Sequence, residues 1–201
     1  MKKMTMSIAL MAGMAVAQAV LAQATVGQSA PPFSATDASG KPVSLADYKG
    51  KYVVLEWVNK DCPFSQKHYN SGNITATQKH AAAKGAAWLA VSTSAAGPKD
   101  TAAASALAAW MKEKNAVPTA LVLDAGPIGR AYGAKTTPHM YVIDPAGKVV
   151  YAGAIDSKAS ANAADIPSSI NYVNLALDEA TAGKPLSKPV TQPYGCSVKY
   201  G

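Results

Sequence analysis

One stretch, Tyr52 to Ser65, constrains the fold of this chain most. Its first part, Tyr52–Val58, is apolar, β-branched and aromatic apart from a single glutamate, which predicts a buried central strand. Cys62 and Pro63 follow almost at once, and Pro63 is well placed in the first turn of a helix. A strand that leads directly into a helix is typical of a domain in which strands and helices alternate.

The rest of the chain continues this alternation. Short apolar runs predict strands, and longer alanine-rich or amphipathic runs predict helices. The expected strands are 33–38, 42–45, 52–58, 88–91, 119–123, 140–143 and 149–152. The expected helices are 63–84, which residues 70–73 can interrupt, and 100–115, 128–132 and 172–181. The order predicts an α/β domain with an N-terminal β-hairpin.

Residues 1–24 have the pattern of a secretory signal. A basic start is followed by a short apolar stretch at 8–21, and Ala22–Ala24 fits the small-x-small cleavage rule, with Val20–Ala22 as a second site. We therefore expect a secreted protein, in a bacterium one that reaches the periplasm. A retained membrane anchor is the alternative, although the apolar run is short for a membrane span.

Cleavage would leave a domain at residues 25–183 and a proline-containing C-terminal arm at residues 184–201. It would also remove two lysines and lower the formal net charge from +7 to +5. The remaining basic residues are scattered, whereas a nucleic-acid binder shows a basic stripe with interleaved aromatic residues. We expect no nucleic-acid partner and no stable membrane insertion after signal removal. Oligomeric state leaves no signature in the sequence.

The chain offers few residues for a metal centre. Its two cysteines are too few for a four-cysteine zinc site, and its three histidines follow no ligand spacing. His68 and His80 fall on the expected helix after Cys62, where a solvated helix face is the better interpretation for both. We expect neither a metal nor a cofactor.

Cys62 is the strongest candidate for chemistry. A cysteine at the start of a helix lies in the positive field of unpaired backbone N–H groups, which favours the thiolate over the thiol. The thiolate is the nucleophile of disulfide exchange. The neighbouring Asp61 acts in the opposite direction, and a small buried apolar cysteine is the alternative interpretation.

A second candidate feature is the segment Thr137–His139, just before a predicted strand. Pro138 cannot donate to a strand ladder, and an X–Pro bond is the kind that can be cis. A cis-proline loop exposes backbone groups to an incoming extended chain, and an ordinary trans turn is the alternative. His139 adjoins Pro138 and is a candidate for stabilising charge near the thiolate.

Together these residues resemble the thioredoxin superfamily, most closely its alkyl hydroperoxide reductase and thiol-specific antioxidant (AhpC/TSA, or redoxin) branch. The resemblance covers roughly residues 27–180. The matching pieces are Gly27, Ala30–Phe33, Gly40–Lys41, Asp47–Lys51, Val53–Leu55, Cys62–Pro63, Tyr132–Gly133, Thr137–Pro138 and Val142–Gly147. It implies a thioredoxin-like fold with a mixed central sheet, in which Cys62 is the nucleophile and Pro138 the cis-proline facing it.

The resemblance also assigns a role to Glu56. Thioredoxins carry a buried acid six residues before the nucleophile, and that position is Glu56 here. A desolvated carboxylate there would have a raised pKa suited to proton transfer. A salt-bridged or surface-facing glutamate is an equally weighted alternative.

The chain departs from the family patterns in two respects. Thioredoxins use Cys-x-x-Cys, but the second position here is Ser65, so the local dithiol is absent. Peroxiredoxins place a proline seven residues and a threonine or serine three residues before the nucleophile, where this chain has Leu55 and Asn59. They also hold peroxide with an arginine near the later strand, where this chain has Pro138–His139. Peroxide reduction therefore ranks below thiol–disulfide exchange.

The second cysteine, Cys196, lies near the end of the arm. Fully extended, the arm from residue 183 to Cys196 spans about 40 Å and can fold back over the domain. Cys196 is then a candidate resolving cysteine for a mixed disulfide on Cys62. A permanent Cys62–Cys196 bridge in a non-catalytic binding or structural module is the alternative.

The sequence thus predicts a secreted thiol–disulfide oxidoreductase with a thioredoxin-like fold. Cys62 exchanges disulfides, the segment Thr137–His139 binds the substrate backbone, Glu56 moves a proton and Cys196 resolves the mixed disulfide. The expected partners are protein thiols and disulfides or a thiol reductant. A thiol peroxidase with the same nucleophile is the enzymatic alternative.

Overall fold

The computed structural model describes residues 23–99 and 101–200. Apart from its last two residues, the predicted secretory signal lies outside the described residues. Within those ranges, no helix combines the length and the apolar character needed to cross a membrane.

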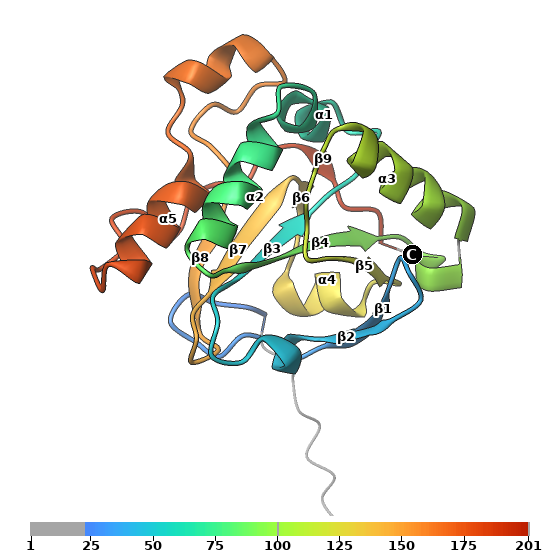
Figure 1. Ribbon diagram of the computed structural model, residues 1–201, viewed down its shortest axis with the longest axis horizontal. Helices are drawn as coiled ribbons and strands as arrows, with labels where there is room; N and C mark the ends of the chain where they lie inside the picture. The colour runs from blue at the N-terminus through green and yellow to red at the C-terminus, as the bar shows by residue number, and fades with distance from the viewer. Residues whose placement is uncertain (1–22, 100, 201) are drawn as a thin grey trace, which may run out of the picture.

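Strands and helices alternate along the chain (Figure 1). The strands are β1 Ser34–Asp37, β2 Pro42–Ser44, β3 Val53–Trp57, β4 Ala87–Thr93, β5 Ala120–Asp124, β6 Thr136–Thr137, β7 His139–Ile143, β8 Val149–Gly153 and β9 Cys196–Ser197. The helices are α1 Pro63–Asn70, α2 Asn73–Ala83, α3 Thr101–Glu113, α4 Pro127–Tyr132 and α5 Tyr172–Thr181. Short 3-10 segments lie at η1 Leu45–Tyr48, η2 Gly97–Lys99 and η3 Ala163–Ser168.

A mixed sheet forms the centre of the domain, with strand order β2-β1-β5-β4-β3-β7-β8. Strand β3 pairs in parallel with β4, and β4 in parallel with β5, whereas β7 runs antiparallel to β3 and β8 antiparallel to β7. The predicted hairpin β1–β2 joins the sheet antiparallel to β5. Since β3 has a partner on each side, the sheet fixes the position of the segment that leads to Cys62.

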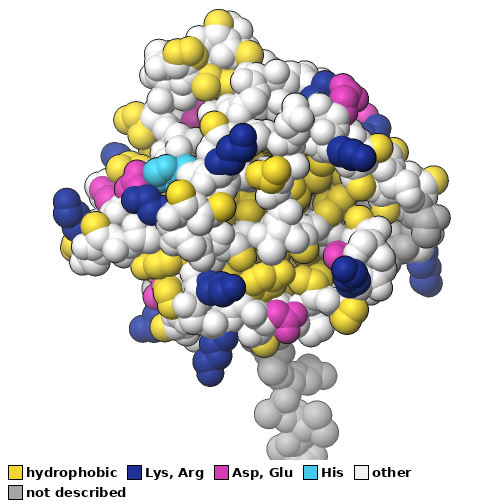
Figure 2. Space-filling view, in the orientation of Figure 1, with side chains coloured by type: hydrophobic (Ala, Val, Ile, Leu, Met, Phe, Trp, Pro, Cys, Tyr) yellow, Lys and Arg dark blue, Asp and Glu magenta, His cyan; other side chains and the backbone are white. Residues whose placement is uncertain are grey.

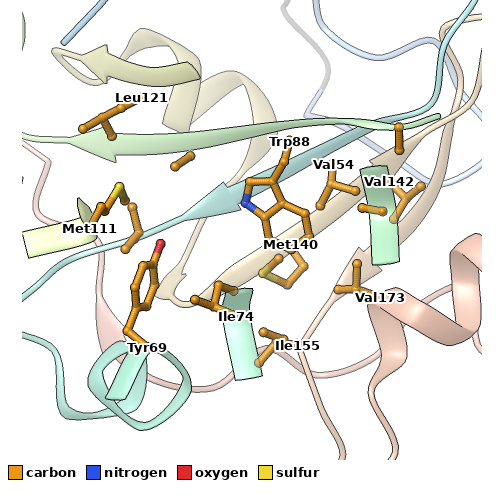
Figure 3. Packing of buried hydrophobic residues seen from close by; sticks show 14 of the residues in the cluster. Val54, Tyr69, Ile74, Trp88, Met111, Leu121, Met140, Val142, Ile155 and Val173 are labelled. Atoms are coloured by element: carbon orange, nitrogen blue, oxygen red, sulfur yellow. The ribbon is translucent and has the colours of Figure 1, made fainter. Parts of the chain in front are cut away.

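Alternate residues of β3 and its extension enter two separate hydrophobic cores. Val54 and Val58 join the core built with α2, α3 and α5, whereas Leu55 and Trp57 join the core built with α4 and the N-terminal hairpin. Figure 3 shows the first core, in which Trp88 lies among aliphatic side chains from several elements. Because both faces of β3 are buried, the strand end is held rigidly.

The helix expected over residues 63–84 is two helices. Helix α1 ends at Asn70, and α2 begins at Asn73. Gly72 between them has a left-handed backbone with φ of +74°, a conformation that glycine adopts without a steric cost. The interruption considered at residues 70–73 is therefore present, and it lets α1 and α2 take different directions.

The C-terminal arm runs back across the domain. It first follows the edge strand β8, where the N–H of Thr191 donates to the carbonyl of Ala152 and the N–H of Ala152 donates to the carbonyl of Pro189, both at 3.1 Å. Further along, β9 pairs antiparallel with β6. Strands of two residues are too short to carry an alternation pattern, so neither β6 nor β9 could be read from the sequence.

Charged side chains are spread over the surface. On the face shown in Figure 2, lysines are scattered among uncharged side chains, and some of them lie beside acidic residues. The large hydrophobic side chains exposed in the described part of the chain include Val117, Ile170 and Val190. They lie on three different segments of the chain.

Candidate active site

Cys62 lies immediately before α1. It is the N-cap residue, with an extended backbone, and Pro63 follows in the first turn. Its carbonyl accepts the first helical hydrogen bond from Gln66 at 2.9 Å. The side chain is buried, with a relative exposure of 1%. The strand-to-helix arrangement expected from the sequence therefore places a buried thiol at the carboxyl end of β3.

The loop that contains Pro138 covers the thiol of Cys62. The Thr137–Pro138 peptide bond is cis, and the thiol of Cys62 donates to the carbonyl oxygen of Thr137 at 2.9 Å. The structure therefore brings together two segments that are 75 positions apart in the sequence. Thr137 is buried as well, so its carbonyl is fixed relative to the sulfur.

The arm brings Cys196 to the same place. In the β6–β9 pair, Cys196 lies opposite Thr137, and the Thr137 hydroxyl donates to the Cys196 carbonyl at 3.4 Å. Gly195 makes this approach possible, because a Cβ atom there would lie 2.1 Å from the Thr137 carbonyl oxygen. Both cysteines are free thiols, and their side chains are in hydrogen-bonding contact.

The two thiols have opposite acidities. Burial disfavours the thiolate of Cys62, but hydrogen bonds from the Cys196 thiol, the Thr137 side chain and the N–H groups of Ser65 and Cys196 outweigh it and lower the Cys62 pKa. Burial, together with its bond to Cys62 and repulsion from it, raises the pKa of Cys196 to about 11, against a small opposing effect of Lys199. Cys62 therefore ionises first, and Cys196 keeps its proton.

Glu56 is buried in the central strand. Its neighbours on that face of the sheet belong to the core shown in Figure 3, and the indole N–H of Trp88 donates to its carboxylate at 2.8 Å. Burial raises the pKa of Glu56 to about 7, although the bond from Trp88 partly offsets this effect. A surface-facing glutamate is therefore excluded, and the buried carboxyl titrates close to neutral pH.

His139 does not serve as a positive charge beside the thiolate. Its ring accepts a hydrogen bond from the N–H of Lys135 at 3.2 Å and packs on Tyr141 with 4.6 Å between ring centroids. Burial, with a smaller contribution from Lys135, lowers the pKa of His139 to about 4. The imidazole is therefore neutral at pH 7, and the charge-stabilising role considered for it is not supported.

The predicted solvated position of His68 is wrong, because this side chain is buried. His68 and Lys67 lie on α1 and face Asp156, which follows β8; the Lys67 ammonium is 3.2 Å from the Asp156 carboxylate. Tyr194 of the arm covers this group and donates its hydroxyl proton to Asp156. His80 does remain partly exposed, paired with Asp178 at 3.0 Å.

Sequence reasoning missed Lys67, Asp156 and Tyr194 altogether. Their contacts join positions 89 and 38 residues apart, so no local spacing relates them. The one available signal was the position of Tyr194, two residues before Cys196. Within residues 23–99 and 101–200, no group of His, Cys, Asp and Glu side chains is arranged to hold a metal ion.

A cavity of about 180 Å³ adjoins the thiol pair. The β3–α1 connection contributes Asn59 and Lys60, the arm contributes Val198 and Lys199, and Thr137 is part of the wall. The cavity is therefore lined in part by Thr137, the residue whose carbonyl contacts the Cys62 thiol.

Comparisons with known proteins agree with this geometry. The model of the AhpC/TSA family matches residues 26–152. A search of curated proteins found no match. Among solved structures, an uncharacterised conserved protein from Geobacillus kaustophilus is similar with a TM-score of 0.73 at 24% identity, covering 88% of this chain and 93% of its own.

Two further structures extend the comparison. A hypothetical protein from Sinorhizobium meliloti has a TM-score of 0.70 at 22% identity, over 88% of this chain and 95% of its own. The thioredoxin domain of a thiol-disulfide oxidoreductase from Bacteroides vulgatus has a TM-score of 0.52 at 25% identity, over 64% of this chain and 87% of that one. The predicted thioredoxin-like α/β fold is confirmed.

Proposed function

Because the chain belongs to the AhpC/TSA family, we propose that it is a thiol–disulfide oxidoreductase whose redox couple is Cys62 and Cys196. One observation carries the proposal: two free thiols in contact, the first with a lowered pKa and the second with a raised one. This asymmetry separates the attacking thiolate from the thiol that waits with its proton.

The exchange proceeds in two steps. The Cys62 thiolate attacks one sulfur of a substrate disulfide; a Cys62–substrate bond forms, the substrate S–S bond breaks, and the departing thiolate takes a proton. Cys196 then loses its proton and attacks the Cys62 sulfur, which releases the second substrate thiol. The substrate gains two electrons and the cysteine pair loses two. A dithiol reductant restores the pair, and the reverse sequence oxidises a dithiol.

Glu56 is proposed to move a proton in the second step. Cys196 needs a base, because burial favours the protonated form of its thiol. Glu56 is a buried acid with a pKa of about 7, so it can take up or release a proton at the working pH. Its place on the strand that leads to Cys62 supports this assignment.

The substrate is proposed to be a protein thiol or disulfide presented as an extended segment. The backbone of Thr137 and Pro138 beside the sulfur supports this, as does the adjoining cavity. His139 contributes packing there rather than charge. The expected signal at residues 1–24 supports action outside the cytoplasm, in a bacterium in the periplasm.

The decisive experiment compares the wild type with Cys62→Ser and Cys196→Ser. The wild type should reduce insulin disulfides in the presence of a dithiol, and Cys62→Ser should abolish the activity. Cys196→Ser should still attack but accumulate a mixed disulfide with the substrate. The absence of insulin reduction together with a Cys62–Cys196 potential below about −300 mV would establish a structural bridge and overturn the proposal. Peroxide consumption by the same proteins tests the peroxidase alternative.

A further inference from the structure

Tyr194 anchors the arm two residues before Cys196. Its hydroxyl donates to Asp156 and is 3.2 Å from Nε2 of His68. Its ring meets Phe64 edge-on with 5.8 Å between centroids, and the Lys67 ammonium lies 5.6 Å from the ring centroid. Two residues of extended chain span roughly 7 Å, so the position of Tyr194 limits where the Cys196 sulfur can lie.

We call the group that receives Tyr194 the tyrosine seat: Lys67, His68 and Asp156. Lys67 and Asp156 have side-chain exposures of 0% and 1%, so their charges are removed from water. A buried ion pair adds little net stability, yet it provides a fixed and directional acceptor. Lys67 and His68 belong to the helix that begins beside Cys62, so the seat and the nucleophile share one rigid element.

The hydrogen bonds of the seat run in one direction. The amide of Asn73 is 2.8 Å from Nδ1 of His68, which accepts from it and leaves the ring proton on Nε2. Nε2–H then donates to the Tyr194 oxygen, and the Tyr194 hydroxyl donates to Asp156. Asp156 keeps two other donors, Lys67 and the N–H of Lys158 at 3.0 Å, so removal of the Tyr194 hydroxyl leaves its charge partnered.

The docked arm also occupies the backbone edge with which an extended substrate would pair. Strand β9 pairs with Thr136 and Thr137, the backbone that faces the Cys62 sulfur. An incoming extended chain must use that edge, so the arm and the substrate compete for it. Gly195 lies so close to Thr137 that nothing fits between them while the arm is docked.

We propose that Tyr194 is a positioning residue: its hydroxyl, held in the tyrosine seat, docks the arm so that Cys196 faces Cys62, and its release opens the Thr136–Thr137 edge to substrate. This inference rests on the proposed Cys62–Cys196 couple. It predicts opposite effects of one substitution on two steps. Loosening the arm makes the first attack by Cys62 easier and the resolution by Cys196 slower.

The test is Tyr194→Phe, which removes the hydroxyl and keeps the ring. Reduced protein is mixed with one equivalent of the aromatic disulfide DTNB. The first thionitrobenzoate released reports attack by Cys62, and the second reports resolution by Cys196. We expect the first release to become severalfold faster and the second to slow by roughly tenfold to a hundredfold, the scale of a hydrogen bond to a charged group. If the substitution makes the equilibrium constant of the Cys62–Cys196 couple against glutathione tenfold smaller, the reduction potential of the couple changes by about 30 mV.

Tyr52→Phe is the matched control, because its hydroxyl also makes one hydrogen bond, to the carbonyl of Ala180 in α5 at 3.0 Å, which lies outside the tyrosine seat. It should leave both releases unchanged. Gly195→Ala is a second variant that dislodges the arm without touching the seat, and it should reproduce both effects of Tyr194→Phe. Unchanged resolution in Tyr194→Phe, or equal slowing of both releases, overturns the positioning role. A wild type without a second release refutes the cysteine couple itself.

Discussion

Two buried polar regions of this domain differ in how their charge is compensated. Glu56 is a single acid inside an apolar core, with the Trp88 indole N–H as its hydrogen-bond donor. The tyrosine seat instead combines a lysine and an aspartate at 3.2 Å with a neutral histidine, and it receives the tyrosine hydroxyl. The lone acid titrates near neutral pH, whereas each charge of the buried pair has a partner of opposite sign. One region is suited to moving a proton and the other to holding a segment.

The largest effect should come from removing one charge of the seat. Lys67→Met leaves Asp156 buried without its cation, which costs about 3–5 kcal/mol in the free energy of unfolding. Urea denaturation at pH 7 measures the loss. A change below about 1 kcal/mol would mean that water reaches Asp156 and that the seat does not differ from a surface ion pair.

Glu56→Gln should reveal the cost of the lone acid through pH. The folded-state pKa of about 7 exceeds the ordinary value of 4.5, so the wild type loses stability as pH rises from about 4.5 to 8. The loss amounts to roughly 3 kcal/mol, at about 1.4 kcal/mol per pH unit. The variant should lack this dependence and be the more stable protein at pH 8. If urea denaturation gives the two proteins the same pH dependence of the free energy of unfolding, the pKa of Glu56 is not raised.

Trp88→Phe should sharpen the same contrast. It removes the indole donor that stabilises the Glu56 carboxylate but keeps an aromatic ring in the core. The pKa of Glu56 should therefore rise further, and the upper end of the pH range over which stability is lost should move up by roughly one pH unit. This upper end is the readout, because the smaller ring lowers stability at all pH values alike. A downward move of the upper end would show that Trp88 does not favour the ionised form.

The smallest effect should come from Asp178→Asn at the surface. Asp178 pairs with Lys84 at 2.8 Å and with His80, and the three side chains are between 31% and 47% exposed. Water and salt screen such pairs, so the loss should be about 0–1 kcal/mol. Urea denaturation at two ionic strengths measures it. A loss as large as that of Lys67→Met would remove the distinction between buried and exposed charge.

The sequence predicted those features of the fold that depend on residues close together in the chain. The strand predicted over Tyr52–Val58 is present as β3, and its alternation places Glu56 and Trp57 on opposite faces, because successive side chains of a strand point to opposite faces. The break near residue 72 was open to prediction through its glycine. His68 was interpreted as part of a solvated helix face, yet Tyr194 covers it from 126 positions away. Contacts of that range leave no periodic trace, so the seat and the β6–β9 pair required the structure.

The meeting of Cys62 and Cys196 also ties the melting behaviour of the protein to its oxidation state. A bond between them would close a loop of about 135 residues in the unfolded chain, and the chain-entropy relation gives about 5 kcal/mol of added stability. By the thermodynamic cycle, the free energy by which the disulfide stabilises the folded state equals the free energy by which folding favours the disulfide. A protein that melts at a much higher temperature when oxidised therefore has a low reduction potential and acts as a reductant. Calorimetry of the two forms is thus a second way to rank the protein as an oxidant or a reductant.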